Sequence, residues 1–298
     1  MASQRDVKQR IESVRNIQKI TSAMEMVAAA RLRRAEQRIA VLRPYAGAIR
    51  RMTRQAAAEA GNVPSLPILN QHDEVKTVGI LLITADRGLA GAFNSQIIRA
   101  GVRAAEEQQA LGRNVRWYAV GRRGNSSLIF RGNEISGGFT GFTDRPVYGN
   151  AREIAETLMS DYVDGLVDEV EIFYNGYVSA LTQVVRAETM LPLQHASVLE
   201  DDAEDGSEDD VSRALVEYEP DPEMILKRLI PDYVEISIFR ALLESTASEH
   251  GARMTAMRNA SENASEVIED LTLEMNRARQ AEITQEIMEV VAGAEALV

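Results

Sequence analysis

Apolar residues recur at steps of three and four toward both ends of this 298-residue chain. In the first part of the chain the repeat contains Ile17, Ile20 or Thr21, Met24, Val27 and Ala28. In the last part it contains Met257, Ala260, Ala264, Val267, Leu271, Met275 and Ala278, and then Ile283, Ile287, Val290 and Ala294. A repeat close to 3.5 residues places an apolar seam along one side of a helix and favours a left-handed supercoil with a partner helix. The two ends therefore predict long helices that pair antiparallel.

The middle of the chain has a different pattern, in which strand-like and helix-like segments alternate. Runs of β-branched and aromatic residues predict strands at 75–84, 115–120, 169–174 and 183–192. Helical spacing predicts helices at 93–111 and 147–162, with a short helix or turn at 126–132 and a glycine-rich loop around 137–141. Such alternation is typical of a sheet with helices on its faces. The predicted fold class is α/β: a long antiparallel two-helix coiled coil plus a small central Rossmann-like α/β domain.

These patterns divide the chain into five parts. They are an N-terminal coiled-coil helix at 1–60, a linker at 61–74, a central α/β domain at 75–198, an acidic loop at 199–214, and an edge segment with the C-terminal coiled-coil helix at 215–298. We expect Pro44 to interrupt the first helix and Pro231 to kink or restart the last one, because an interior proline removes a hydrogen bond. Asp221 and Pro222 provide a cap and a first-turn proline, and Gly251 is expected to be a mild weak point.

Charge is distributed unevenly along the chain. Residues 1–60 have a net charge of +8, whereas the whole chain has −12 and contains the acidic run 200–210, which is expected to be a solvated loop. The basic first helix fits either a nucleic-acid-binding arm or a surface that meets acidic proteins. Tyr45 is the only aromatic residue among the first ninety, which argues against nucleic acid as the partner.

The residue types needed for several kinds of chemistry are missing. The sequence has no cysteine, so it can form neither a disulfide nor a thiolate metal site. His72, His195 and His250 are scattered, and none has a second histidine at ligand spacing. We therefore expect no catalytic, cofactor-binding or metal-binding residues.

No apolar run is long enough to span a bilayer, and the charged start lacks the apolar core of a secretory signal.

The segment Ile83–Asn94, ITADRGLAGAFN, is the one stretch that imitates a ligand-binding loop. It lies between a predicted strand and a predicted helix, where α/β domains bind phosphates. However, Gly88 and Gly91 do not have the spacing of the dinucleotide fingerprint, and no lysine follows them as in a P-loop. We favour a tight strand-to-helix turn that needs glycine.

Two other functions stay open on sequence grounds alone. A nucleotide-binding α/β enzyme with coiled-coil arms would bind a nucleotide at micromolar concentration or turn it over. A nucleic-acid-binding coiled coil would show DNA or RNA binding that weakens steeply with salt.

Three motifs resemble one known family. IESVRNIQKITSAMEMVAAARLRRA, TADRGLAGAFN and ARQAEITQEIMEVVAGAEAL are similar to segments of the γ subunit of the F-type ATP synthase. The last motif is the most specific, because Ile283, Thr284, Glu286, Glu289 and the pair Gly293-Ala294 have the spacing of the family signature. The resemblance covers essentially the whole chain and is looser in the centre.

The resemblance implies a central-stalk rotor subunit. Such a subunit couples proton-driven rotation of the c ring to ATP synthesis, or the reverse, at catalytic sites on the β subunits, and it is not itself catalytic. The implied partners are three α and three β subunits, the ε subunit and the membrane c ring, without nucleic acid. The implied location is peripheral, on the cytoplasmic face of the bacterial inner (plasma) membrane, with membrane association only through the complex.

The resemblance also implies contact roles for individual residues. Contacts with the αβ hexamer are expected at Met24, Arg277, Arg279, Gln280, Thr284 and Glu286. A basic band toward the β subunits is expected at Arg31, Arg33, Arg34 and Arg38. Contacts with the c ring or the ε subunit are expected at Tyr218 and Glu219. For Thr284 and Glu286, a merely solvated helix face stays open as an alternative.

Overall fold

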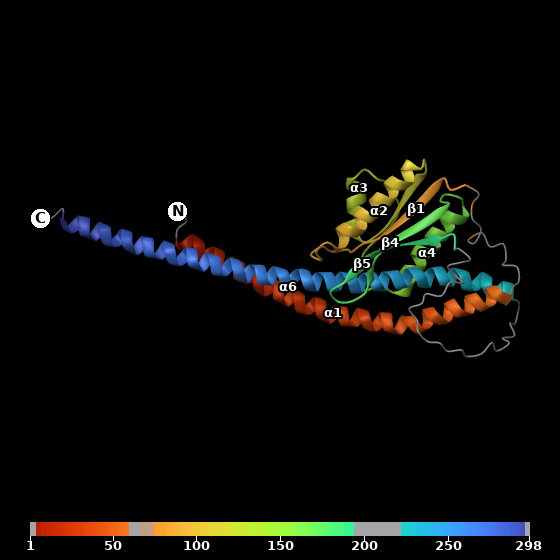
Figure 1. The fold of residues 1–298 in the computed structure, drawn as a ribbon, viewed down its shortest axis with the longest axis horizontal. Coiled ribbons are helices and arrows are strands. Elements are labelled where there is room, and N and C mark those ends of the chain that lie inside the picture. Colours follow the sequence, from red (N-terminus) through yellow and green to blue (C-terminus); the bar gives the residue numbers. More distant parts are fainter. Residues whose placement is uncertain (1–3, 60–67, 69–71, 73, 194–221, 296–298) are drawn as a thin grey trace. The chain divides into compact units, whose positions relative to one another are not determined.

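The computed structural model of the chain describes residues 4–59, 68, 72, 74–193 and 222–295. The chain splits into two compact units: the helix-pair unit, Met1–Ala30 with Arg253–Val298, and the α/β unit, Arg31–Ala252. Two long helices contribute to both units, α1 at Gln4–Glu59 and α6 at Pro222–Glu295 (Figure 1). The five-part division predicted above stays a prediction, and its acidic loop lies outside the described residues.

Both prolines that were expected to break these helices lie inside them. α1 continues through Pro44 and α6 continues through Pro231, so the predicted interruption and restart are wrong. An interior proline costs ~3 kcal/mol of helix stability, and packing offsets this cost. Ile230 and Val234, on either side of Pro231, are buried in the core of the α/β unit. The prediction that α6 begins at Pro222 is confirmed, whereas Asp221 lies outside the described residues.

Within the helix-pair unit, α1 and α6 run antiparallel. The amide of Gln18 donates to the hydroxyl of Ser265 at 2.6 Å, and Arg258 Nε pairs with Glu25 Oε1 at 2.9 Å. The seam of α1 follows steps of four and three residues and includes the buried residues Val7, Ile11, Thr21 and Ala28. Gln18 and Glu25 occupy intervening seam positions, where their partners on α6 satisfy them.

Several residues assigned to the seam from sequence lie outside it. Ile17, Ile20 and Val27 are 53%, 59% and 53% exposed, so their seam assignment is wrong, whereas that of Thr21 and Ala28 is confirmed. Each of the three precedes a true seam position by one residue. The stripe of Ile17, Ile20 and Val27 was predicted because its side chains are large and apolar. The helices pack instead along the next stripe of α1, whose residues are small or hydrogen-bonded.

The last part of α6 has no partner helix among the described residues. α1 begins at Gln4, fourteen residues before Gln18, so its start lies opposite α6 about fourteen residues beyond Ser265. Ile283, Ile287 and Val290 lie past that point and are 48%, 57% and 72% exposed. The prediction that they continue the paired seam is therefore wrong, and the side chain of Ala294 lies outside the described part.

On α6 the predicted seam is confirmed over most of its paired length. Met257 and Ala264 are buried, and Ala260, Leu271, Met275 and Ala278 are partly buried. Val267 is the exception, with 44% exposure. No helix in the described ranges is apolar enough over a sufficient length to span a lipid bilayer.

The α/β unit is built on a five-stranded sheet with the order β3-β2-β1-β4-β5. The strands are β1 Thr77–Ile83, β2 Asn114–Val120, β3 Ile135–Phe139, β4 Glu169–Tyr177 and β5 Gln183–Leu191. The first four are parallel, and β5 runs antiparallel beside β4. The connecting helices are α2 Phe93–Ala110, α3 Arg122–Phe130 and α4 Tyr148–Val163. The predicted fold class is thus confirmed.

One predicted element of this unit is wrong. Gly137 and Gly138 lie in strand β3 and not in a glycine-rich loop. A Cβ atom on Gly137 would lie 2.9 Å from Cδ1 of Tyr118, so the neighbouring aromatic ring fills the space that a side chain would take. Glycine therefore marks close packing inside this strand, as glycine in a strand commonly does.

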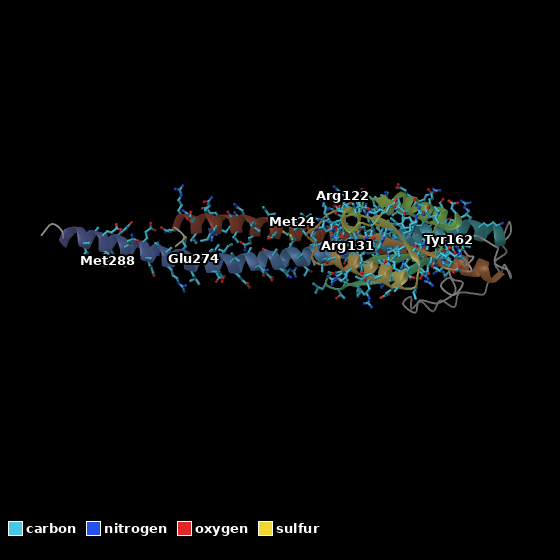
Figure 2. The ribbon with its side chains drawn as sticks, turned by 90° about the horizontal axis from the view of Figure 1, so that it is seen from above. Met24, Arg122, Arg131, Tyr162, Glu274 and Met288 are labelled. Carbon is cyan, nitrogen blue, oxygen red and sulfur yellow. The ribbon has the colours of Figure 1, made fainter. Side chains whose placement is uncertain are left out.

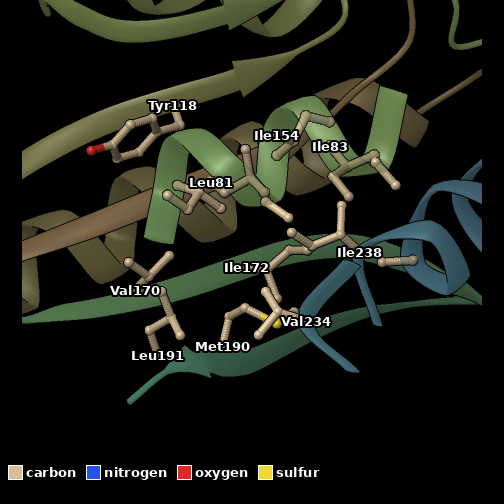
Figure 3. Close-up of a cluster of buried hydrophobic side chains, with 14 of the residues drawn as sticks. Leu81, Ile83, Tyr118, Ile154, Val170, Ile172, Met190, Leu191, Val234 and Ile238 are labelled. Carbon is tan, nitrogen blue, oxygen red and sulfur yellow. The ribbon is translucent and has the colours of Figure 1, made fainter. Parts of the chain in front are cut away.

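Helices cover both faces of the sheet. α2 and α3 pack on one face, over residues such as Ile80 and Leu82. α4 and the first part of α6 pack on the other face, where Val234 and Ile238 meet Ile172 and Met190 (Figure 3). The first part of α6 is therefore an integral part of the α/β core.

Candidate functional site

The turn between β1 and α2 is held by the carboxylate of Asp86. Its Oδ2 accepts the backbone N–H groups of Gly141 and Thr143 at 2.9 and 3.2 Å and the hydroxyl of Thr143 at 3.0 Å. Its Oδ1 accepts the backbone N–H of Arg122 at 3.1 Å. Burial by itself would raise the pKa of Asp86, but the hydrogen bonds from Gly141, Arg122 and Thr143 hold this pKa below its ordinary value. One side chain thus joins the segments that follow three parallel strands.

The rest of this turn is also structural. Asn94 Oδ1 accepts the backbone N–H of Ala85 at 2.9 Å, which fixes the entry into α2. Leu89 and Gly91 both have positive φ, at 62° and 55°, as a tight turn requires. The favoured interpretation of Ile83–Asn94 as a strand-to-helix turn is confirmed.

Helix α6 passes over the edge of the sheet where parallel strands end, which is the usual ligand crevice of such folds. The hydroxyl of Thr246 donates to the carbonyl of Thr143 at 2.9 Å, and that of Ser248 donates to the carbonyl of Asn175 at 3.0 Å. A Cβ on Gly251 would lie only 2.9 Å from the carbonyl oxygen of Ala180. Gly251 therefore allows α6 to approach the backbone of Ala180 closely, and its predicted role as a mild weak point stays a prediction. The chain itself occupies this edge.

A network of charged side chains joins α6 to strands β4 and β5, and sequence reasoning missed it. Arg240 pairs with Glu188 at 2.8 Å and with Glu244 at 3.6 Å, and Arg186 pairs with Glu244 at 3.8 Å. Burial raises the pKa of Glu244, and Arg240 and Arg186 oppose that effect. The only sequence signal is the i,i+4 spacing of Arg240 and Glu244, because the strand partners lie far away in the chain.

The four arginines of the predicted basic band do not share one face. Arg31, Arg34 and Arg38 line a cleft of the α/β unit, whereas Arg33 is exposed and does not line it. Arg31 forms an ion pair with Asp144, in the loop before α4. The structure therefore brings three of the four residues together.

The predicted hexamer contacts lie in two separate places. Met24 is partly buried on α1, next to the Glu25–Arg258 ion pair (Figure 2). Arg277, Arg279, Gln280, Thr284 and Glu286 are all exposed on α6. Gln280 comes 22 residues after Arg258, about 33 Å farther along a helix that rises 1.5 Å per residue. Tyr218 and Glu219 lie outside the described residues.

The helix-pair unit has exposed apolar rows that the predicted site residues do not include. On α1 they contain Ile17, Ile20, Met26 and Val27. On α6 they contain Ile283, Ile287, Met288, Val290 and Val291, and Met288 marks this part in Figure 2. Apolar rows of this size indicate contact with other chains. Exposed apolar rows on two long helices are typical of a subunit of a larger assembly.

Comparisons with known proteins agree with this class. The model of a family described as ATP synthase matches residues 3–297. ATP synthase gamma chains of Moorella thermoacetica and Rubrobacter xylanophilus are 44% and 43% identical to this chain over 297 residues. These alignments cover 100% of this chain and 100% and 99% of the two relatives.

Solved structures give the same result. A chain from the central stalk and c-ring structure of the Tetrahymena thermophila mitochondrial ATP synthase matches with a TM-score of 0.61 and 27% identity, over 81% of this chain and 99% of that one. A chain of the Euglena gracilis mitochondrial ATP synthase has a TM-score of 0.67 at 18% identity, which supports the fold, over 99% of this chain and 94% of that one.

The chain belongs to the ATP synthase gamma chain family. It is thus a subunit of an enzyme complex, and the resemblance drawn from its three motifs is confirmed. The fold matches that of ATP synthase central stalks, as the resemblance implied.

Proposed function

We propose that the chain is the non-catalytic rotor of an F-type ATP synthase and couples c-ring rotation to ATP synthesis, or the reverse. The observation that carries this proposal is the uncovered apolar row at Ile283, Ile287 and Val290, in a chain of this family. A helix that continues beyond its intramolecular partner while retaining apolar residues needs a surrounding surface. Three α and three β subunits would supply that surface.

The proposed partners of the two units differ. The helix-pair unit contacts the α and β subunits, and the α/β unit contacts the ε subunit and the c ring, partly through Tyr218 and Glu219. The central-stalk and c-ring assignment of a 27% identical neighbour supports the second contact. We place the chain peripherally on the cytoplasmic face of the inner membrane, reached only through the complex; its full-length relatives are ATP synthase subunits of bacteria.

Catalysis is assigned to the β subunits. In the α/β unit, Thr246 and Ser248 of α6 bond to carbonyl groups at the edge where related folds bind nucleotides. This internal packing supports a mechanical use of the fold, and it weighs against the alternative of a nucleotide-dependent enzyme.

The proposed hexamer contacts suit a moving surface. Arg277, Arg279, Gln280, Thr284 and Glu286 are exposed, and exposed ion pairs contribute only ~0–1 kcal/mol each. Of the predicted basic band, the exposed Arg33 would meet acidic β segments in the same weak, salt-screened way. Shallow contacts of similar strength at every rotor angle avoid a deep energy minimum that would stop rotation.

Replacing Met24 with lysine tests this account of the upper contact. A new charge-assisted hydrogen bond to an acidic β segment would contribute ~1.5–3 kcal/mol at one rotor angle only. We expect ATP-driven proton pumping in membrane vesicles to fall several-fold more than ATP hydrolysis, because only pumping turns the rotor against a load. Met24→Leu, with similar volume and no charge, should leave both rates near wild type. Equal losses of the two activities, or no loss, would count against the coupling role.

A further inference from the structure

We propose that the cleft lined by Arg31, Arg34, Arg38 and Arg145 is a binding site for a phosphate-type oxyanion. The cleft has a volume of about 490 Å³ and lies within the α/β unit, between α1, the loop before α4, and α6. Its other lining residues are Ala35, Asp144, Leu243, Thr246 and His250. A concave site of this size falls in the range that small ligands occupy.

The cleft holds more positive charge than its own residues neutralise. Asp144 is the only carboxylate in the lining, and one of its oxygens pairs with Arg31. Its other oxygen is buried, with His250 Nε2 at 3.9 Å. Within the described part of the chain, the guanidinium groups of Arg34, Arg38 and Arg145 form no ion pair. Three cations are therefore left for an outside anion.

The placement of these cations weakens helix α1 slightly while no anion is bound. Arg31 and Arg34 are three residues apart on α1, and Arg34 and Arg38 are four apart, so all three lie on one stripe of the helix. Like charges at these spacings destabilise a helix. Arg145 adds a fourth positive charge from a different segment. A bound oxyanion would turn this repulsion into attraction.

The type of anion follows from the donors. Guanidinium groups present planar pairs of N–H donors that match phosphate oxygens in two-point contacts. The lining contains no Phe, Tyr or Trp, and the imidazole of His250 is buried, so the described wall offers little stacking surface for a nucleobase. The chemistry therefore favours recognition of phosphate groups, whether free or at the end of a nucleotide. Arg33, outside the cleft, is left for contact with acidic protein surfaces.

Titration of the purified full-length chain with inorganic phosphate and with ATP tests this site. Both titrations are run by calorimetry at an ionic strength kept constant with chloride. We expect saturable binding of at least one of the two probes. The probe that binds more tightly shows whether the cleft prefers free phosphate or the phosphate groups of a nucleotide. Because the free chain is titrated, the outcome is independent of the rotor role.

Matched variants of α1 decide whether the cleft is responsible. The double variant Arg34→Ala/Arg38→Ala should weaken binding about tenfold or more, a loss of about 1.4 kcal/mol or more. Arg33→Ala removes an equally basic, exposed neighbour and should leave affinity unchanged. Thermal unfolding of the same samples verifies that each variant is folded. The proposal is overturned if neither probe binds, if Arg33→Ala weakens binding as much as the double variant, or if an acidic peptide such as oligoglutamate binds more tightly than both probes.

Discussion

Gly121→Ala is expected to remove much of the stability of the α/β unit, on the order of 4 kcal/mol, from backbone strain together with steric overlap. Gly121 has φ = 89°, in the region that favours glycine. A Cβ at this position would lie 2.3 Å from the carbonyl oxygen of Thr84 and 2.7 Å from its carbonyl carbon. These are backbone atoms at the end of β1, so no side-chain rotation can relieve the overlap. The change should separate the ends of β1 and β2.

The chain offers a direct control for this prediction. Gly112 also has positive φ, at 80°, but a Cβ there would meet nothing within 4 Å. Gly112→Ala should therefore cost only the backbone strain, ~1–2 kcal/mol. Denaturant unfolding can be followed through Trp117, the single tryptophan, which is buried in β2. Similar losses in the two variants would show that close packing at Gly121 is not important.

Asp86→Ala is expected to have the second largest effect, on the order of 3 kcal/mol, because it leaves several backbone donors without an acceptor. The substitution removes the acceptor for Arg122, Gly141 and Thr143. Asp86→Asn keeps one acceptor oxygen and should lose less. Glu134→Ala, at an exposed position, should change the free energy of unfolding by less than ~0.5 kcal/mol. An effect of Asp86→Ala as small as that of Glu134→Ala would contradict this role.

The same carboxylate makes stability depend on pH. Its pKa is lower in the folded chain than its ordinary value of 3.8, so the unfolded chain binds the proton at higher pH. The stabilisation is fully present above the unfolded pKa and is lost as pH falls through the lower, folded pKa. The stability difference between wild type and Asp86→Asn should therefore shrink below about pH 4. A difference that stays constant through this range would show that charge is not involved.

The sequence predicted the parts of the fold that depend on local periodicity. The strand and helix segments of the α/β unit follow from runs of apolar residues, and β1, α2, β2, α4 and β4 all begin within two residues of their predicted starts. The predicted interruption at Pro44 and restart at Pro231 were wrong because tertiary packing outweighed a local rule, whereas a kink at Pro231 stays a prediction.

The seam of the helix pair shows why register is harder to predict. Residues Ile17, Ile20 and Val27 are more apolar than Gln18, Thr21 and Ala28, yet the helices pack along the second set. That choice depends on Ser265 and Arg258, which satisfy Gln18 and Glu25 from more than two hundred residues away. Extending the steps of four and three from Val7 and Ile11 would have given the correct stripe.

The candidate sites also divide into those encoded in one contiguous segment and those that depend on distant residues. Motifs led to the correct family and to the turn at Asp86, because both are encoded in contiguous segments. The cleft around Arg34 and the network around Arg240 bring together residues from distant segments, so only their local parts, the basic residues of α1 and the i,i+4 pair of Arg240 and Glu244, could be seen in the sequence. The assigned contacts from Met24 to Glu286 remain predictions, because they concern surfaces of other chains.

A rotor subunit must turn within its complex, and this rotation can be observed directly. The chain has no cysteine, and Phe130, at the end of α3, is 92% exposed, so Phe130→Cys gives a single site for a visible probe. The labelled chain would be assembled with cysteine-free α and β subunits fixed to a surface and supplied with ATP. The rotor account predicts that the probe turns in one direction, with three pauses in each turn. A probe that stays still while the same complexes hydrolyse ATP would contradict it.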